Sequence, residues 1–186
     1  MLKIAIVGTH GTGKTTLAYK LVTEAKQRGK NAQICNELAR TSPFPLNEKA
    51  NLDGCLWLVS KQINEELSAK AQGCEILVCD RSVMDMIAYV PLNLAHGEIY
   101  THLHSFCLRW FKTYDKIFWV HPTSTIGLVD DGIRALDPKY QKKIHQRFQD
   151  VIGYAIGNPR VKVIKSSCIF ADTLEEVIEE AFKTDS

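Results

Sequence analysis

The stretch Gly8-Thr9-His10-Gly11-Thr12-Gly13-Lys14-Thr15 decides how this chain folds. It matches G-x-x-x-x-G-K-[S/T] in full, after a β-branched run at residues 3–7 and before a segment with helical spacing. The glycines let successive backbone N–H groups point inward, and the N-terminus of the following helix adds partial positive charge. These properties predict a phosphate-binding loop, or P-loop, between the first strand and the first helix.

The chemistry of this loop predicts MgATP as its ligand. We expect the nucleotide to bind along the residues His10, Gly11, Thr12, Gly13, Lys14, Thr15 and Thr16. Lys14 would reach the β- and γ-phosphates, and the Thr15 hydroxyl would be a ligand of Mg2+. Asp80 follows the apolar run 76–79, which is the Walker B arrangement, so its carboxylate is expected to hold Mg2+ beside Thr15. His10 occupies a position that the pattern leaves free, and we assign it no catalytic role.

Short strand-like runs alternate with helical spacing along the rest of the chain. We expect strands at residues 3–7, 31–35, 75–79, 116–120 and 161–164. Strands separated by helices imply right-handed crossovers and a parallel sheet. Because Asp80 must lie beside the P-loop, the third strand must neighbour the first. The prediction is an α/β P-loop NTPase fold, a three-layer sandwich around a five-stranded parallel sheet of order 2-3-1-4-5.

Two further features concern the helices and the core. Asp137 and Pro138 predict the start of the fifth helix, and Gly157 predicts its end. The group His96, His102, His104 and Cys107 has no zinc-like spacing and is interpreted as structural. We expect the three tryptophans to fill the core: Trp57, Trp110 and Trp119.

Length and composition predict one domain over residues 1–186, and the resemblance to P-loop kinases described below implies a small lid at about 121–137. Apolar residues make up 45% of the chain and charged residues 24%, which are ordinary values for a globular domain. The formal net charge of +2 gives no overall field that would favour nucleic acid or a membrane. There is no apolar run of membrane-spanning length and no signal peptide to read. Six cysteines without a C-x-x-C pair favour free thiols, so we expect a cytoplasmic protein.

Polar residues also follow the second and third predicted strands. Glu37 closes the second strand and Arg81 follows Asp80, so both are expected to face the same crevice as Lys14. Glu37 would orient or deprotonate an acceptor hydroxyl, and Arg81 would hold a phosphate. The alternatives are a salt bridge from Glu37 to Arg40 and a solvated Arg81 at a helix start.

The segment 130–134 falls where kinases with a P-loop keep a lid. Its glycine beside two aspartates reads as a flexible loop, from which Arg134 could swing onto the phosphates and exclude water. The alternative is an ordinary exposed loop.

Three short motifs indicate which class of P-loop proteins the chain resembles. No Asn-Lys-x-Asp segment for reading guanine is present, and the length leaves no room for the lid domain of AAA-type ATPases. Asp80-Arg81-Ser82 resembles the motifs of thymidylate kinases and deoxynucleoside kinases. Together with Glu37-x-Ala-Arg40 and Asp131-Gly132-x-Arg134, it resembles the P-loop kinase family that contains the ribosylnicotinamide kinase domain of NadR-type proteins. The resemblance covers nearly the whole chain. It implies an adenine bound between the Arg134 side of the lid and the loop 166–170.

The first functional hypothesis is a kinase that transfers phosphate from MgATP to a nucleoside, a nucleotide or a similar small hydroxyl acceptor. The second is an ATPase that regulates or assembles a partner protein. A polynucleotide kinase has little support because a charge of +2 provides no basic track. A small-molecule acceptor is therefore the expected partner. The identity of the acceptor, the choice of ATP over GTP and a homodimer are left open.

Overall fold

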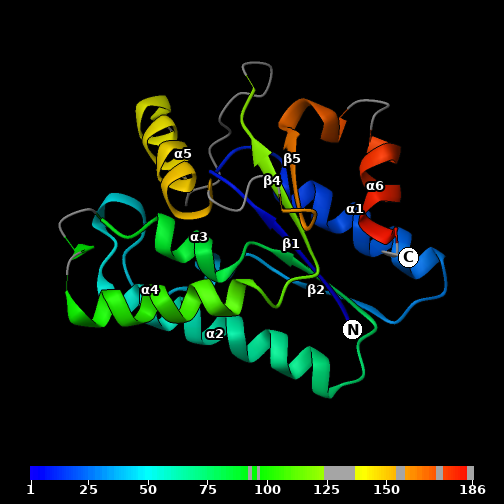
Figure 1. Cartoon of the computed structure of the whole chain (residues 1–186), viewed down its shortest axis with the longest axis horizontal. Coiled ribbons are helices and arrows are strands. Elements are labelled where there is room, and N and C mark those ends of the chain that lie inside the picture. The colour runs from blue at the N-terminus through cyan, green and yellow to red at the C-terminus, as the bar shows by residue number, and fades with distance from the viewer. Residues whose placement is uncertain (92–93, 96, 124–136, 154–157, 171–173, 184–186) are drawn as a thin grey trace.

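The computed structural model describes the chain except for residues 92–93, 96, 124–136, 154–157, 171–173 and 184–186 (Figure 1). A parallel sheet in the order β2-β3-β1-β4-β5 forms its centre, as predicted. The strands are β1 (Leu2–Val7), β2 (Ala32–Cys35), β3 (Ile76–Asp80), β4 (Lys116–His121) and β5 (Val161–Lys165). In the register of β1 and β3, Ile6 lies opposite Asp80, so the last residue of β3 reaches the P-loop.

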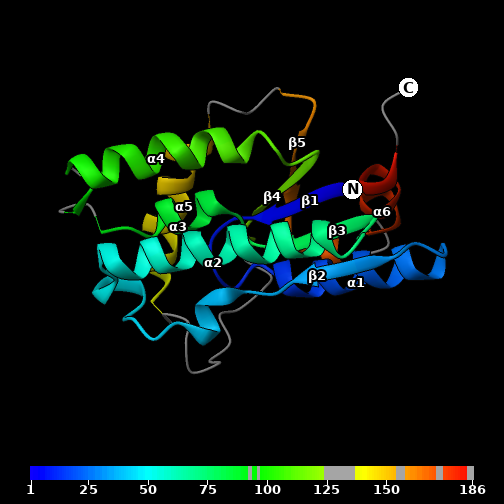
Figure 2. The same cartoon turned by 90° about the horizontal axis from the view of Figure 1, so that it is seen from below.

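Helices cover both faces of this sheet, which gives the predicted three layers. One face carries α1 (Lys14–Gln27) and α6 (Leu174–Phe182), which lie together in Figures 1 and 2. The other carries α2 (Leu52–Ala71), α3 (Val83–Ala88), α4 (Glu98–Phe111) and α5 (Pro138–Ile152). Within β1, Ile4 and Ile6 pack toward the first face, and Ala5 and Val7 toward the second. Burial on both faces explains why the central strands are apolar runs without alternation.

Most of the expected elements are present, and their ends shift by a few residues. Asp137 caps α5 by accepting a hydrogen bond from the Lys139 N–H at 2.8 Å. Helix α5 ends at Ile152, and the end predicted at Gly157 lies outside the described residues. The tryptophan prediction holds for Trp119, which is fully buried, whereas Trp57 and Trp110 are only partly buried against the core.

Two general expectations can be compared with the described residues. All six cysteines lie in this part of the chain and are free thiols. Among the described residues, the helices are too short or too polar to cross a lipid bilayer.

Candidate active site

The P-loop connects β1 to α1 and needs glycine for a steric reason. Gly8 has φ of +135°, and a Cβ at this position would lie 2.5 Å from the carbonyl oxygen of Val120 on β4. Gly13, at φ of +84°, is the N-cap of α1, and no side chain caps this helix. The first N–H groups of α1 therefore point into the loop, as an anion site requires.

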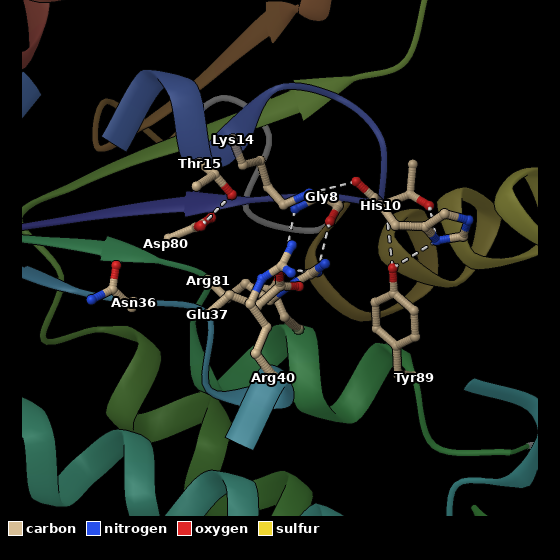
Figure 3. Close-up of polar contacts among 12 residues, drawn as sticks. Gly8, His10, Lys14, Thr15, Asn36, Glu37, Arg40, Asp80, Arg81 and Tyr89 are labelled. Atoms are coloured by element: carbon tan, nitrogen blue, oxygen red, sulfur yellow. Dashed lines mark hydrogen bonds and ion pairs between the residues drawn. The ribbon is translucent and has the colours of Figure 1, made fainter. Parts of the chain in front are cut away.

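Lys14 folds back over this loop. Its Nζ donates hydrogen bonds to the Thr9 carbonyl at 2.5 Å and to Thr12 Oγ1 at 3.3 Å (Figure 3). Burial, together with the nearby Arg81 charge, lowers the pKa of Lys14 to about 7. A phosphate in the loop would add negative charge next to this ammonium and favour its charged form. Thr12 is itself tied to the loop, because its hydroxyl donates to Thr9 O at 3.1 Å.

Thr15 and Asp80 meet as the motifs predict. Thr15 Oγ1 donates a hydrogen bond of 2.6 Å to Asp80 Oδ2, although 65 residues separate them. A hydroxyl and a carboxylate are ligands that suit Mg2+, which is typically held by one or two protein oxygens plus phosphates and water. The described residues contain no cluster of three or more acidic, histidine or cysteine side chains that would form a metal site of its own. Thr16 lies in the first turn of α1.

Arg81 and Glu37 form a buried ion pair beside the loop. Arg81 Nε lies 2.6 Å from Glu37 Oε1, and the two side chains are 7% and 8% exposed. Arg81 Nη1 also donates to the Gly8 carbonyl at 3.2 Å. The interpretation of Arg81 as a solvated residue is therefore wrong. The alternative pair with Arg40 exists at 3.5 Å, but Arg40 is 40% exposed and lies outside the buried pair.

The sequence analysis missed Asp85, which organises the start of α3. Its carboxylate accepts hydrogen bonds from the Ser82 N–H at 2.8 Å, the Ser82 hydroxyl at 2.9 Å and the Gly8 N–H at 3.3 Å. It also lies 3.3 Å from Arg81 Nη1. Burial raises the pKa of Asp85 despite the neighbouring Arg81. The pattern Ser82-x-x-Asp85 is a capping box with an acidic third position, which is a signal that could have identified this residue.

His10 is fixed by aromatic side chains of α3 and α5. Its backbone N–H donates to the Tyr89 hydroxyl at 3.0 Å, and its ring stacks on Tyr140 with a centroid distance of 5.8 Å. The side-chain amide of Gln141 donates to the His10 carbonyl at 2.8 Å. His10 is therefore a buried structural part of the loop.

Two cavities open beside these groups. The first, of about 70 Å³, is called the inner cavity, and its polar end is formed by His10, Glu37, Arg81 and Asp85. Most of its remaining wall is apolar and includes Leu46, Leu58, Met86 and Val90. The second, of about 360 Å³, is called the outer cavity and shares Asn47, Tyr89 and Val90 with the first.

The predicted site residues fall into two groups. Lys14, Thr15, Glu37, Asp80 and Arg81 lie around the P-loop at the carboxyl ends of β1, β2 and β3 (Figure 3). Arg134 and nearly all of the predicted lid lie outside the described residues. The segment Ser166–Phe170 forms a short 3-10 helix after β5, where Ser166 Oγ accepts a hydrogen bond from the Thr123 N–H at 3.0 Å.

Solved structures share this fold. Deoxyadenosine kinase from M. mycoides with bound dATP aligns over 99% of this chain and 100% of its own, with a TM-score of 0.65 and 16% identity. NadR protein in complex with NAD and AMP-PNP aligns over 100% of this chain, with a TM-score of 0.64 and 17% identity. The chain spans about half of NadR, 51% of its length. At these identities the likeness establishes a kinase-like P-loop fold.

Comparison at the level of sequence gives the family. No curated protein matches the chain. A family model described as an AAA domain matches residues 3–168, which include the P-loop, the Glu37–Arg81 pair and all of the sheet except Leu2. This match covers most of the sequence, and the chain accordingly belongs to the AAA domain family of P-loop proteins.

Proposed function

We propose that this chain is a kinase that transfers the γ-phosphoryl group of ATP to a hydroxyl group of a nucleoside. The observation that carries the proposal is the buried pair of Glu37 and Arg81, which forms the polar end of a cavity next to Lys14. A protein that only hydrolyses ATP has no need for a buried pair of a carboxylate and a guanidinium next to an apolar cavity. Likeness of fold to a deoxyadenosine kinase supports the same reading.

The charges around the inner cavity favour an uncharged acceptor over a nucleotide. Its polar end holds two carboxylates, Glu37 and Asp85, and one guanidinium, Arg81, that is already paired with both. Arg40 contacts Glu37 from outside the cavity, so a phosphate on the acceptor would find both guanidiniums already paired and would lie against the two carboxylates. The inner cavity is small, and the outer cavity next to it lies within the size range of small-molecule sites. We infer that the reactive hydroxyl enters the inner cavity and that the rest of the acceptor extends past Tyr89.

Each predicted residue then has a role in the transfer. Glu37 holds the acceptor hydroxyl and takes its proton as the oxygen bonds to the γ-phosphorus. The bond from that phosphorus to the β,γ-bridging oxygen breaks, and Lys14 and Arg81 stabilise the negative charge that is shared among the oxygens. Thr15 and Asp80 would hold Mg2+, which neutralises phosphate charge when bound. Arg134, outside the described residues, is assigned to cover the phosphates.

The proposal extends to the domain organisation and the location of the protein. We propose a single kinase-like domain over residues 1–186, with the lid at about 121–137. Free thiols support a cytoplasmic location, and a homodimer remains open.

The first part of the test identifies the acceptor. A panel of nucleosides and nucleoside monophosphates is added to the protein with MgAMP-PNP, and the unfolding temperature is measured. A ligand that binds the folded state raises this temperature by mass action. We expect a nucleoside to stabilise the protein more than its own monophosphate does.

The second part separates transfer from hydrolysis. The variant Glu37→Gln should keep its nucleotide affinity and lose about 10²-fold or more in transfer to the nucleoside, because an acid–base group is removed. ATP hydrolysis without acceptor should fall much less. Arg40→Gln is the control, since its exposed side chain contacts the same carboxylate from outside. If Glu37→Gln lowers hydrolysis and transfer equally, the ATPase that regulates a partner becomes the better reading.

A further inference from the structure

Tyr89 connects the P-loop to the cavities. It is the residue that ends α3, one helical turn after Asp85. Asp85 accepts a hydrogen bond from the Gly8 N–H, and the Tyr89 hydroxyl accepts one from the His10 N–H. One short helix thus holds the nucleotide loop at two backbone positions. Both residues line the inner cavity, and Tyr89 also lines the outer one.

The Tyr89 hydroxyl makes two bonds to the same loop residue. Besides the backbone bond, it lies 3.0 Å from His10 Nδ1 (Figure 3). The hydroxyl accepts from the His10 N–H, and it shares a second hydrogen bond with Nδ1 whose direction is set by the tautomer of the ring. Burial raises the pKa of Tyr89, which keeps the phenol protonated and able to donate.

The ring of Tyr89 faces the reacting groups. The guanidinium carbon of Arg81 lies 5.3 Å from the ring centroid, which is a cation–π distance. On another side, the ring packs edge-on against Phe148 of α5 at 6.4 Å. Tyr89, whose hydroxyl holds the P-loop, is therefore one of the residues that a molecule in either cavity can contact.

We propose that Tyr89 is a positioning residue that couples acceptor binding to nucleotide binding through its hydrogen bonds to His10. This proposal rests on the kinase function proposed above. An acceptor that packs against the ring restricts its motion, and the hydroxyl then holds His10 and the following loop amides in the geometry that binds phosphate. Because binding free energies are linked, a nucleotide must favour the acceptor by the same factor.

The test uses two matched variants. Tyr89→Phe removes the hydroxyl and keeps the ring against Arg81. Tyr140→Phe is the control, because the Tyr140 ring also contacts His10 but the contact is a stacking one that the variant retains. Calorimetric titration with MgAMP-PNP, without acceptor, measures the dissociation constant. We expect it to rise about fivefold in Tyr89→Phe, the size of effect expected when the P-loop backbone loses its buried hydrogen bond to the hydroxyl, and to stay within about twofold in Tyr140→Phe.

The same titration is then repeated with the nucleoside selected by the panel at saturation. In the unmodified protein the nucleoside should tighten MgAMP-PNP binding about fivefold or more, and in Tyr89→Phe this factor should fall toward one. A merely structural role of the hydroxyl would lower stability without changing this factor. An unchanged dissociation constant or an unchanged factor in Tyr89→Phe overturns the coupling alone. A panel without any nucleoside ligand overturns the kinase function and the coupling with it.

Discussion

Glu66 of α2 lies at the centre of a buried polar network that includes Lys3 of β1. Its Oε2 accepts hydrogen bonds from Lys3 Nζ and from Trp110 Nε1, both at 2.8 Å. Its Oε1 accepts from Gln62 Nε2 at 2.9 Å and from the Tyr114 hydroxyl at 2.5 Å. The side chains of Lys3 and Glu66 are 8% and 1% exposed, so the ion pair is shielded from water.

The variant Glu66→Gln should destabilise the protein by about 3 kcal/mol. An amide can present an oxygen to only one pair of these four donors, and its NH2 group must face the other pair. The substitution also leaves the Lys3 ammonium buried without its countercharge, which typically costs 3–5 kcal/mol. We take the lower end of this range because the ammonium keeps its contacts with the rings of Tyr114 and Trp110, at 4.4 Å and 5.1 Å.

Urea denaturation followed by circular dichroism measures this change. A loss of about 3 kcal/mol corresponds to a fall of roughly 6–12 °C in unfolding temperature for a domain of this size. Lys3→Met and the double variant Lys3→Met/Glu66→Gln complete a mutant cycle. We expect the double variant to lose less stability than the two single variants do together. The second substitution removes the side chain that the first one leaves buried without a partner. A loss below about 1 kcal/mol in Glu66→Gln, or additive losses in the cycle, would refute the reasoning.

Three further predictions concern the P-loop. Burial lowers the pKa of Lys14 to about 7 in the folded protein, below the ordinary 10.5. Between these two pH values Lys14 is protonated in the unfolded chain and neutral in the folded one. The unfolding free energy should therefore rise with pH in this window, by about 1.4 kcal/mol per pH unit. Lys14→Met should lose this rise, which urea titrations at several pH values within that window would show. Gly8→Ala should lower the free energy of unfolding by about 2 kcal/mol or more and abolish nucleotide binding. The added Cβ would meet the Val120 carbonyl, and the φ of +135° is strained for alanine. Thermal unfolding measures the first effect and AMP-PNP titration the second. In Asp80→Asn, the Mg2+ concentration for half-maximal AMP-PNP binding should rise about tenfold, while affinity in a chelator stays the same; equal affinities at all Mg2+ concentrations would remove Asp80 from the metal site.

Local patterns in the sequence were sufficient for the fold and for the nucleotide half of the site. The P-loop pattern between a strand and a helix predicts where phosphate binds. The requirement that Asp80 lie near Thr15 predicts that β3 neighbours β1, which the sheet order confirms. Such features are readable because glycine positions, apolar periodicity and helix caps act over a few neighbouring residues.

The residues that we propose to face the acceptor were predicted less completely. Glu37 and Arg81 were expected to share a crevice, and they form a pair. The sequence also allowed Glu37 to pair with Arg40, and the fold contains both pairs, a buried one with Arg81 beneath the P-loop and an exposed one with Arg40. Asp85 was missed because its capping box resembles that of any helix start until Gly8 and Arg81 are placed around it.

Tertiary structure alone decided which polar residues are buried together. Lys3 and Glu66 are 63 residues apart, and His10 and Tyr89 are 79 apart. In the sequence, Glu66 is one acid on an amphipathic helix and Tyr89 is one aromatic in an apolar segment. Their partners depend on how α2 and α3 pack against the sheet, and a hydrogen bond between distant residues leaves no periodicity or spacing in the sequence. The phosphate loop is therefore determined locally, whereas the groups that hold it in place are determined by the packed fold.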